Sequence, residues 1–477
     1  MGGGQAAGVS GDHRLTAHVK RFYERWVGDD RFRAAVGADP AAAAAQLGLD
    51  LDPGPLSFLW EDAAPQDPDA PEVRAFQSLM SRRQAYLDFC ANDGGAITAY
   101  QQWRARQRAR TAYAVGAMIA PFQLHLPFAV ELTRGCSLGC WFCGVSARPL
   151  NAVLRTDLKR WEGLLRALRG VFGASVMRGF LYWATDPLDH PDYEAHAEVF
   201  RRVCGRFPPT TTAAPLADPA RTRRLAAMAF AGDCPPEGMR FSVVSRRQLE
   251  EIHAAFSTEE LLEITLVPVN RESLLALAEA GRAREMAKRR PERAAFERRK
   301  LSESDDDQIR SHRTIACVSG FLIDPVSGWI RLISPTLASD RWPDGYAVFD
   351  EKGFDSVDEF AGALEAMVQR NMGLEPPDRL ILQDGVRLSA VSAVEVRAAA
   401  RGLSAAFRAG RRDLGHVPAL AAAFAGGARL DEVSERVAGR FGIDSAKVRA
   451  DVVALWREGV LVEPLFAADA AAAGTAA

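Results

Sequence analysis

The sequence lacks any apolar run that approaches the roughly 20 residues needed to cross a bilayer. Its glycine-rich start, Met1–Ser10, has neither the basic segment nor the apolar segment of a secretory signal peptide. Excess charge is also missing, since 59 basic and 61 acidic side chains give a formal net charge of −2. Such a balance does not require a polyanionic partner. We therefore expect a cytoplasmic protein with no membrane and no nucleic-acid partner.

The chain also lacks an even number of cysteines: it has seven, so they cannot all be paired in disulfides. A secreted disulfide framework favours an even number in a shorter chain, whereas clustered cysteines in a reducing compartment more often bind metal or perform chemistry. Three of the seven are clustered. With 477 residues, 48% of them apolar, the chain is long enough for two or three domains.

The periodicity of apolar residues changes along the chain. Phe22, Trp26, Phe32 and Val36 recur at helical spacing, and Pro40 opens a further helix. The ends contain little that can be buried and are expected to be disordered. The predicted segments are disordered ends at 1–11 and 467–477, a helical region at 12–120, an α/β region at 121–312, a hairpin-containing extension at 313–410 and a helical module at 411–466.

Two charged stretches carry no readable chemistry. The arginine-rich QQWRARQRAR at 101–110 is interpreted as a solvated helix face rather than a nucleic-acid patch. Residues 279–312 are interpreted as a long exposed helix and loop.

Strand-like runs alternate with helical stretches beyond residue 121. This alternation predicts a parallel sheet with crossover helices. Further along, RTIACVSGFLIDPVSGWIRLISPT predicts an antiparallel hairpin with its turn at 324–328. The expected parallel strands are 128–133, 177–184, 209–214, 239–245 and 262–270.

The segment ELTRGCSLGCWFCGVS places Cys136, Cys140 and Cys143 directly after an apolar strand. Three thiolates on one tight loop can each bind one iron of a [4Fe–4S] cluster, which leaves the fourth iron open to a chelating ligand. The alternative is a structural zinc site. Zinc usually takes four ligands with a second cysteine pair elsewhere, and this chain has only scattered single cysteines besides the cluster. We expect one cluster.

This spacing at a strand end resembles the radical S-adenosylmethionine (SAM) superfamily. The resemblance implies a partial (β/α)6 TIM-type barrel, SAM bound to the open iron, and reductive cleavage to a 5′-deoxyadenosyl radical. It places Phe142 against the adenine. It also assigns the SAM amino group to Ala184, Thr185 and Asp186 in YWATDPLDHPDY, where the family commonly has Gly-Gly-Glu. Ser242 and Ser245 are its candidates for contacts with the ribose or carboxylate, unless they face water.

Longer strings resemble the radical SAM peptide epimerases of PoyD type, which modify ribosomally made precursor peptides. They are GCSLGCWFCGVSA, YWATDPLDHPDY, TTTAAPL, TIACVSGFLIDPVSGWIRLISP and ASDRWPDGY. The resemblance implies that the radical removes a Cα hydrogen from an L-residue and that a thiol on the opposite face returns a hydrogen atom. An electron donor such as flavodoxin or ferredoxin is implied as well.

Cys317 is the catalytic candidate for the hydrogen-atom donor. The family hairpin carries a second cysteine, where this chain has Thr336, and a threonine O–H bond is too strong for this role. If that second cysteine is the family's donor, this chain performs another reaction on the peptide radical. Cys317 on its own is also compatible with a buried strand residue, and packing roles are expected for Cys90, Cys204 and Cys234.

The module at 411–466 resembles a winged helix of PqqD type, which binds a leader peptide. Asp431 and Asp444 are expected to cap two of its three helices. Its acidic and basic residues are balanced, which argues against DNA. A packing domain without a ligand is the alternative.

Three classes of function remain from the sequence. The first is L-to-D epimerisation of a precursor peptide. The second is another peptide radical reaction, namely cross-linking, dehydrogenation or excision. The third is a non-catalytic iron–sulfur or leader-binding scaffold.

Overall fold

The computed structural model describes residues 11–61, 63–117, 119–155, 157–235, 237–275, 278–292, 315–408 and 413–466. The predicted disordered ends therefore lie outside the described residues, except that Gly11 begins a helix. Most of the charged stretch, 293–312, lies outside them as well. The chain divides into two compact units: unit 1 is Met1–Phe89 with Asp186–Ala276, and unit 2 is Cys90–Thr185 with Leu277–Ala477. Neither unit begins or ends at 120, 312 or 410, where we expect domain boundaries.

The N-terminal helices of unit 1 pack around a cluster of apolar side chains. Phe22, Phe32 and Val36 are buried in it, which confirms the helical spacing, and the rings of Phe22 and Phe32 meet edge to face with centroids 5.2 Å apart. The Asp39 side chain accepts the Ala42 N–H and so caps the helix that Pro40 opens. The elements are α1 (Gly11–Gly28), α2 (Asp30–Ala38), α3 (Pro40–Gln46), η1 (Gly54–Leu59) and α4 (Pro71–Ala91).

Unit 1 also contains a parallel sheet in the order β4-β5-β6. Phe241 of β5 pairs with Thr212 of β4 and with Leu266 of β6. Strands and helices alternate here, as predicted from residue 209 onward. The elements are η4 (Pro187–Asp189), α7 (Tyr193–Cys204), β4 (Thr210–Thr212), α8 (Pro219–Ala231), β5 (Met239–Val243), α9 (Arg246–Ala255) and β6 (Thr265–Pro268).

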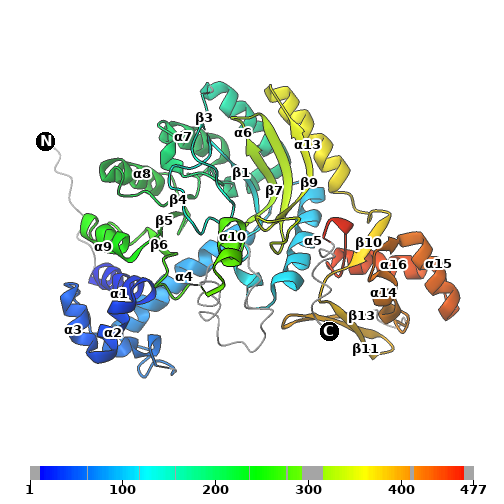
Figure 1. Ribbon diagram of the computed structural model, residues 1–477, viewed down its shortest axis with the longest axis horizontal. Coiled ribbons are helices and arrows are strands. Elements are labelled where there is room, and N and C mark those ends of the chain that lie inside the picture. Colours follow the sequence, from blue (N-terminus) through cyan, green and yellow to red (C-terminus); the bar gives the residue numbers. More distant parts are fainter. Residues whose placement is uncertain are drawn as a thin grey trace. The chain divides into compact units, whose positions relative to one another are not determined.

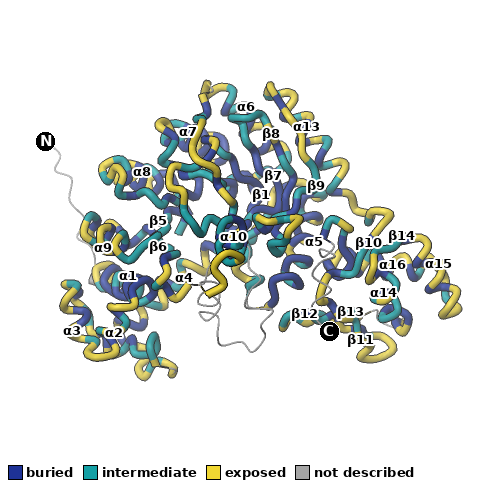
Figure 2. Tube along the Cα trace, viewed as in Figure 1, coloured by how far each residue is buried: buried dark blue, intermediate teal, exposed yellow. Residues whose placement is uncertain are grey.

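Unit 2 contains a four-stranded sheet in the order β1-β7-β8-β9, of which Figure 1 labels β1, β7 and β9. Strand β1 is parallel to β7, whereas β7, β8 and β9 run antiparallel, which confirms the predicted hairpin. The turn uses Gly328 with a φ of +70°, a conformation that favours glycine. Strand β1 is buried along its whole length (Figure 2). The strands are β1 (Leu126–Val130), β7 (Val318–Asp324), β8 (Trp329–Pro335) and β9 (Tyr346–Gly353).

The strand predicted at 177–184 is not formed. Gly173–Arg178 fold as the 3-10 helix η3, and Phe180 alone joins β1, through an isolated parallel bridge to Ala129. Gly179 lies so close to Phe128 that a Cβ atom would come within 2.1 Å of its ring. The helical start of the run therefore leaves one point of contact with β1 in place of a ladder.

The partial (β/α)6 barrel stays a prediction. Strand β1 and strands β4 to β6 belong to separate sheets, one in each unit. No helix in the described part of the chain is both long enough and apolar enough to cross a membrane. The other elements of unit 2 outside its C-terminal part are α5 (Thr98–Val115), η2 (Ala120–Phe122), β2 (Thr133–Arg134), β3 (Ala152–Val153), α6 (Leu158–Phe172), α10 (Gly281–Arg289) and α13 (Val357–Asn371).

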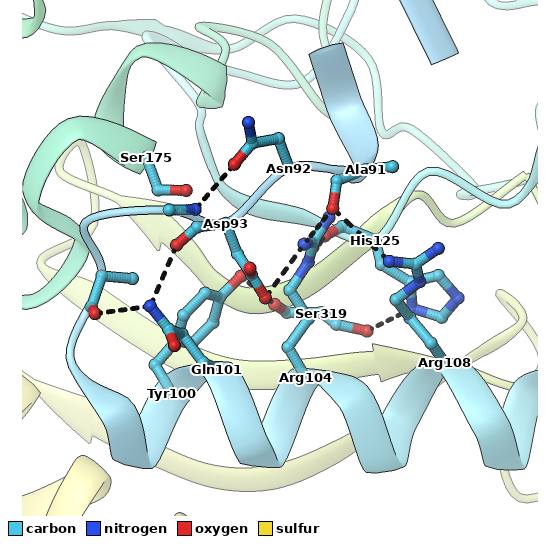
Figure 3. Close-up of polar contacts among 12 residues, drawn as sticks. Ala91, Asn92, Asp93, Tyr100, Gln101, Arg104, Arg108, His125, Ser175 and Ser319 are labelled. Atoms are coloured by element: carbon cyan, nitrogen blue, oxygen red, sulfur yellow. Dashed lines mark hydrogen bonds and ion pairs between the residues drawn. The ribbon is translucent and has the colours of Figure 1, made fainter. Parts of the chain in front are cut away.

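Helix α5 contradicts the interpretation of its arginines as a solvated face. Arg104 is only 1% exposed. Figure 3 shows Arg104 among backbone carbonyls: its guanidinium donates to the oxygen of His125 at 2.6 Å and to that of Ala91 at 2.9 Å. The imidazole Nδ1 of His125 lies 2.7 Å from the hydroxyl of Ser319 on β7. Burial is tolerated because the guanidinium N–H groups find acceptors.

Two more arginines of α5 are buried against the C-terminal part of unit 2. Arg106 lies over the ring of Trp456 at 3.9 Å, and Arg110 over that of Phe466 at 3.7 Å. Such cation–π contacts pair a charged face with an apolar core. Because arginines occupy the buried face of α5, its sequence has no clear apolar stripe, and the pattern of apolar residues wrongly predicts a surface helix.

The C-terminal part of unit 2 has the three helices and the final strand that the sequence predicts. Its small sheet has the order β14-β10-β15 and so takes β10 from before residue 411. Asp444 caps α16, whereas Asp431 lies inside the first turn of α15, because β14 leads directly into that helix and Arg429 takes the cap position. The elements are β10 (Arg379–Leu382), β11 (Arg387–Ser392), β12 (Glu395–Ala400), β13 (Leu403–Arg408), α14 (Val417–Phe424), β14 (Ala428–Arg429), α15 (Leu430–Phe441), α16 (Ser445–Arg457), β15 (Leu461–Val462) and η5 (Pro464–Phe466).

Candidate functional site

The three clustered cysteines lie on one loop, residues 135–149, which we call the cysteine loop. It leaves the sheet just beyond the carboxyl end of β1, and the antiparallel pair β2–β3 closes its base. Gly135 begins the loop with a φ of +89°, and a Cβ there would meet the carbonyl oxygen of Pro149 at 2.4 Å. A side chain at this position would force the base of the loop open.

Backbone contacts hold the loop in place. The Cys136 N–H donates to the oxygen of Arg148 at 2.8 Å. Arg282 of α10 secures the far side: its backbone N–H donates to the oxygen of Cys143 at 2.8 Å, and its guanidinium to that of Cys140 at 2.7 Å. Arg282 could not be picked out from the sequence, because nothing in its surroundings distinguishes it from other arginines in the charged stretch.

Three cysteine thiols are suitable ligands for an iron–sulfur cluster, although their side chains are not arranged to hold one in this structure. All three cysteines are half-buried. The sulfur of Cys143 accepts the Ala147 N–H at 3.3 Å, the kind of contact that stabilises a thiolate or a cluster sulfur. Among the described residues, no three or more His, Cys, Asp or Glu side chains are grouped to hold a metal ion. A cluster would therefore require the three cysteine sulfurs to come closer together.

A cavity of about 620 Å³ lies within unit 2 between the cysteine loop and the sheet. Its volume is in the range typical of small-molecule sites. Carboxylates, guanidinium groups and aromatic rings all contribute to its wall, so it suits a ligand that is both zwitterionic and aromatic. The lining residues are Glu131, Arg134, Gly135, Val145, Ser146, Ala147, Arg148, Trp183, Ala184, Leu322, Asp324, Ser327, Trp329, Arg331, Asp344 and Tyr346.

Glu131 is the most perturbed carboxyl of this wall. Its Oε1 accepts the Ala184 N–H at 2.9 Å. Burial raises the pKa of Glu131 from its ordinary value of 4.5 to about 7; the Ala184 hydrogen bond opposes this rise, and the charge of Asp324 adds to it. A carboxyl with this pKa changes charge near neutrality, which is typical of functional sites. No pattern in the sequence distinguishes Glu131 in advance.

Two aromatic residues form another part of the wall. The rings of Trp183 and Tyr346 meet edge to face with centroids 5.7 Å apart. Burial raises the pKa of the Tyr346 phenol to about 12, so it remains protonated at neutral pH.

The predicted SAM contacts fall into two groups. In unit 2, Ala184 lines the cavity, Thr185 is hydrogen-bonded to the hydroxyl of Thr133, and Phe142 lies on the cysteine loop with its ring edge to face against Trp141. In unit 1 are Asp186, Ser242 and Ser245. The chain thus brings Phe142, Ala184 and Thr185 into the unit that holds the cysteine loop.

Asp186 is already engaged within unit 1. Its carboxylate accepts the Thr212 hydroxyl at 2.8 Å, the Ala213 N–H at 2.7 Å and the Leu188 N–H at 3.0 Å. Burial nevertheless raises its pKa. Most of its acceptor capacity is therefore used to tie β4 to the turn at η4.

Ser245 likewise has a structural partner, since its hydroxyl caps α9 by accepting the Gln248 N–H at 3.0 Å. Ser242 is a half-buried residue of β5.

Cys317 lies at the amino end of β7. Its carbonyl oxygen accepts the Leu126 N–H at 2.6 Å, so it lies beside the start of β1, whereas the cysteine loop follows the end of β1. The four residue steps from Leu126 to Val130 span about 13 Å at 3.3 Å per residue. Thr336 follows β8 at the same end of the sheet as Cys317. Of the other cysteines, Cys90 and Cys204 are buried, as expected for packing residues.

No protein-family model and no solved structure matches the chain. One curated relative is 35% identical over 379 residues, which cover 76% of this chain and 72% of the relative. It is the "Uncharacterized protein y4wI" of Sinorhizobium fredii (strain NBRC 101917 / NGR234). Identity at this level over most of both chains means that the present protein belongs to the same family as y4wI.

Proposed function

We propose that this protein is a cytoplasmic radical SAM enzyme that epimerises residues of a ribosomally made precursor peptide from L to D. One observation carries the proposal. Cys136, Cys140 and Cys143 follow the carboxyl end of β1 on a loop that borders a cavity large enough for a nucleoside-sized ligand. Parallel strands commonly present ligands at this end, where loops can supply side chains from several strands.

The residues present suit both cofactors. The three thiolates would hold one [4Fe–4S] cluster, and Ala147 would donate its N–H to the cluster side of Cys143. When bound, the cluster and SAM would supply abstraction of a hydrogen atom from a carbon of the substrate. Trp183 and Tyr346 would limit the access of water at the cavity wall. Glu131 contributes a carboxyl group whose pKa of about 7 lets it change charge near neutral pH.

Epimerisation needs a hydrogen-atom donor on the peptide face opposite the site of abstraction. Cys317 is the proposed donor. Its place at the amino end of β7 lies across the length of β1 from the cysteine loop, so a cofactor and a peptide unit would have to fit between them.

A second candidate is a peptide reaction that loses hydrogen, such as cross-linking, dehydrogenation or excision. It is favoured by two observations: Cys317 is not among the residues that line the cavity, and Thr336 stands at the end of β8.

The first experiment asks whether the cluster exists. The full chain is reconstituted anaerobically with iron and sulfide, beside a Cys136→Ala/Cys140→Ala/Cys143→Ala variant and a Cys204→Ala control. We expect about four irons per chain in the wild type and the control, and none bound specifically in the triple variant. Zinc in tetrahedral thiolate coordination at the loop would overturn the proposal.

The second experiment identifies the reaction. The reconstituted protein receives SAM, a flavodoxin or ferredoxin reductant, and the precursor peptide encoded nearest to its gene, all in D2O. Epimerisation adds one deuterium per event, whereas cross-linking or dehydrogenation removes two hydrogens. Absence of 5′-deoxyadenosine would indicate the non-catalytic scaffold instead.

The C-terminal part of unit 2 is the proposed leader-binding site. Its β14-β10-β15 sheet and α14 to α16 share one hydrophobic core, as a folded peptide-binding module requires. Hydrogen exchange of the full chain with and without the leader tests this assignment. We expect protection within residues 377–466 with the leader and none with a scrambled leader; equal exchange would contradict it.

A further inference from the structure

One carboxyl oxygen in the cavity lacks a partner. Glu131 follows β1 directly, and its Oε1 is fixed by the Ala184 N–H at 2.9 Å. Its Oε2 has no hydrogen-bond partner among the described residues. The side chain is half-buried and forms part of the cavity wall. One oxygen is therefore held in place while the other remains available to a ligand.

The charges around Glu131 do not compensate it. Arg331 of β8 is the cation that most affects Glu131, but its guanidinium is paired with the carboxylate of Glu351. Asp324 of β7 acts in the opposite sense, because its negative charge disfavours ionisation of Glu131. The titratable groups that share the cavity wall are Arg134 of β2, Arg148 of the cysteine loop, Asp324 of β7, Arg331 of β8, Asp344 just before β9 and Tyr346 in β9.

The resemblance to radical SAM enzymes assigns the SAM amino group to Asp186, at the place of the family's glutamate. That carboxylate already accepts hydrogen bonds from Thr212, Ala213 and Leu188 within unit 1. A ligand at Asp186 would have to share this carboxylate with three donors already in place. Only one oxygen of Glu131 is engaged in this way, by the Ala184 N–H.

We propose that Glu131 is the residue that binds the α-amino group of SAM in this cavity, through Oε2, in place of Asp186. The inference rests on the proposed function and deepens it. An ammonium N–H that donates to Oε2 would give this oxygen a hydrogen-bond partner and would stabilise the negative charge of the carboxylate. No other group on the cavity wall compensates that charge fully. The Ala184 N–H serves as a positioning contact that orients the carboxyl toward the cavity.

If Glu131 binds the amino group, the affinity for SAM should depend on pH. In the empty cavity Glu131 ionises with a pKa of about 7, and the protonated form is not competent to accept the amino group. Apparent affinity falls in proportion to the competent fraction, so SAM binding should be about tenfold weaker at pH 6 than at pH 8. The ligand's own titration is common to every variant and cancels in a comparison between proteins.

The test is isothermal titration calorimetry on the reconstituted, anaerobic full chain between pH 6 and pH 8. SAM is compared with 5′-methylthioadenosine, which lacks the amino-acid end. The proteins are wild type, Glu131→Gln and Asp324→Asn, with thermal unfolding as a check that each variant folds. The Asn side chain keeps the oxygen that accepts the Ser327 N–H, so the hairpin turn is preserved.

We expect Glu131→Gln to weaken SAM binding at pH 8 by about tenfold or more, typical of a lost charge-assisted hydrogen bond, and to lose the wild type's additional pH dependence. Binding of 5′-methylthioadenosine should be unchanged. Asp324→Asn should keep the dependence and move its midpoint to lower pH, because the charge that raises the Glu131 pKa is gone. Equal SAM affinity and equal pH dependence in wild type and Glu131→Gln would overturn the inference and leave the proposed function standing. A wild type that binds no SAM at any pH would overturn both.

Discussion

The N–H of Leu126 donates to the carbonyl oxygen of Cys317 at 2.6 Å, which places this thiol-bearing residue beside the first residue of β1. The cysteine loop begins beyond the last residue of the same strand. A hydrogen-atom donor and a site of hydrogen abstraction must lie on opposite sides of one Cα atom, so their separation along β1 bears directly on the reaction.

Replacement of Cys317 by alanine therefore tests the donor. If the proposed reaction holds, we expect Cys317→Ala to continue to form 5′-deoxyadenosine with the peptide, because the cysteine loop and the cavity wall are unchanged, while deuterium incorporation from D2O falls to background. Mass spectrometry of the peptide and chromatography of the nucleoside measure the two quantities. The matched control is Cys204→Ala, a buried thiol of α7. Undiminished deuterium incorporation in Cys317→Ala would place the donor elsewhere.

Two glycines of the cysteine loop allow a matched test of its conformation. Gly135 has a φ of +89° and no room for a Cβ, whereas Gly139 has a φ of +60° and nothing within 4 Å. Gly139→Ala should lower the free energy of unfolding by about 1–2 kcal/mol, because alanine is strained in the left-handed conformation. Gly135→Ala adds a clash with the backbone of Pro149 and should also lower the iron bound per chain after reconstitution. Equal iron content in both variants would show that the base of the loop is adaptable.

How much the sequence predicts depends on the kind of signal. The hairpin of β7 and β8 is predicted correctly because its apolar strands flank a turn that contains Pro325 and Gly328. The strand expected at 177–184 fails because the apolar character of Phe180 does not reveal that the preceding residues form a 3-10 helix. Strength of hydrophobic pattern predicts burial better than it predicts the type of element.

Polar residues are the harder case. The cysteine cluster stands out through its spacing, whereas Glu131 and Arg282 take their roles from partners distant in sequence. At Asp186 a motif position predicts a ligand contact, and the structure adds partners that the motif does not reveal, since the side chain closes a turn with Thr212 and Ala213. Contacts of this kind depend on the folded arrangement of strands and have no local pattern.

The buried arginine of α5 makes a stability prediction. Arg104 donates to the carbonyl oxygens of His125 and Ala91 (Figure 3) and to that of Cys90. Arg104→Met would remove this donor from the oxygens of His125 and Cys90, whereas the Ala91 oxygen also accepts from Arg108. We expect a loss of about 3 kcal/mol in the free energy of unfolding. Arg108→Met on the exposed side of the same helix is the control, with an expected loss below about 1 kcal/mol. Urea unfolding monitored by far-ultraviolet circular dichroism compares them, and equal losses would contradict a structural role for the Arg104 network.

Glu131 makes a prediction about stability and pH. Its pKa is about 7 in the folded chain against an ordinary value of 4.5, so the folded state binds more protons than the unfolded state between these pH values. Stability of the wild type relative to Glu131→Gln must then fall as pH rises from about 4.5 to 7 and level off above. A difference of about 2.5 pH units corresponds to roughly 3 kcal/mol at most. Thermal unfolding at pH 5.5 and pH 8 measures this change. The stability of Glu131→Gln relative to the wild type should be higher at pH 8 than at pH 5.5. A relative stability that stays constant with pH would mean that Glu131 ionises normally and is not enclosed by the cavity wall.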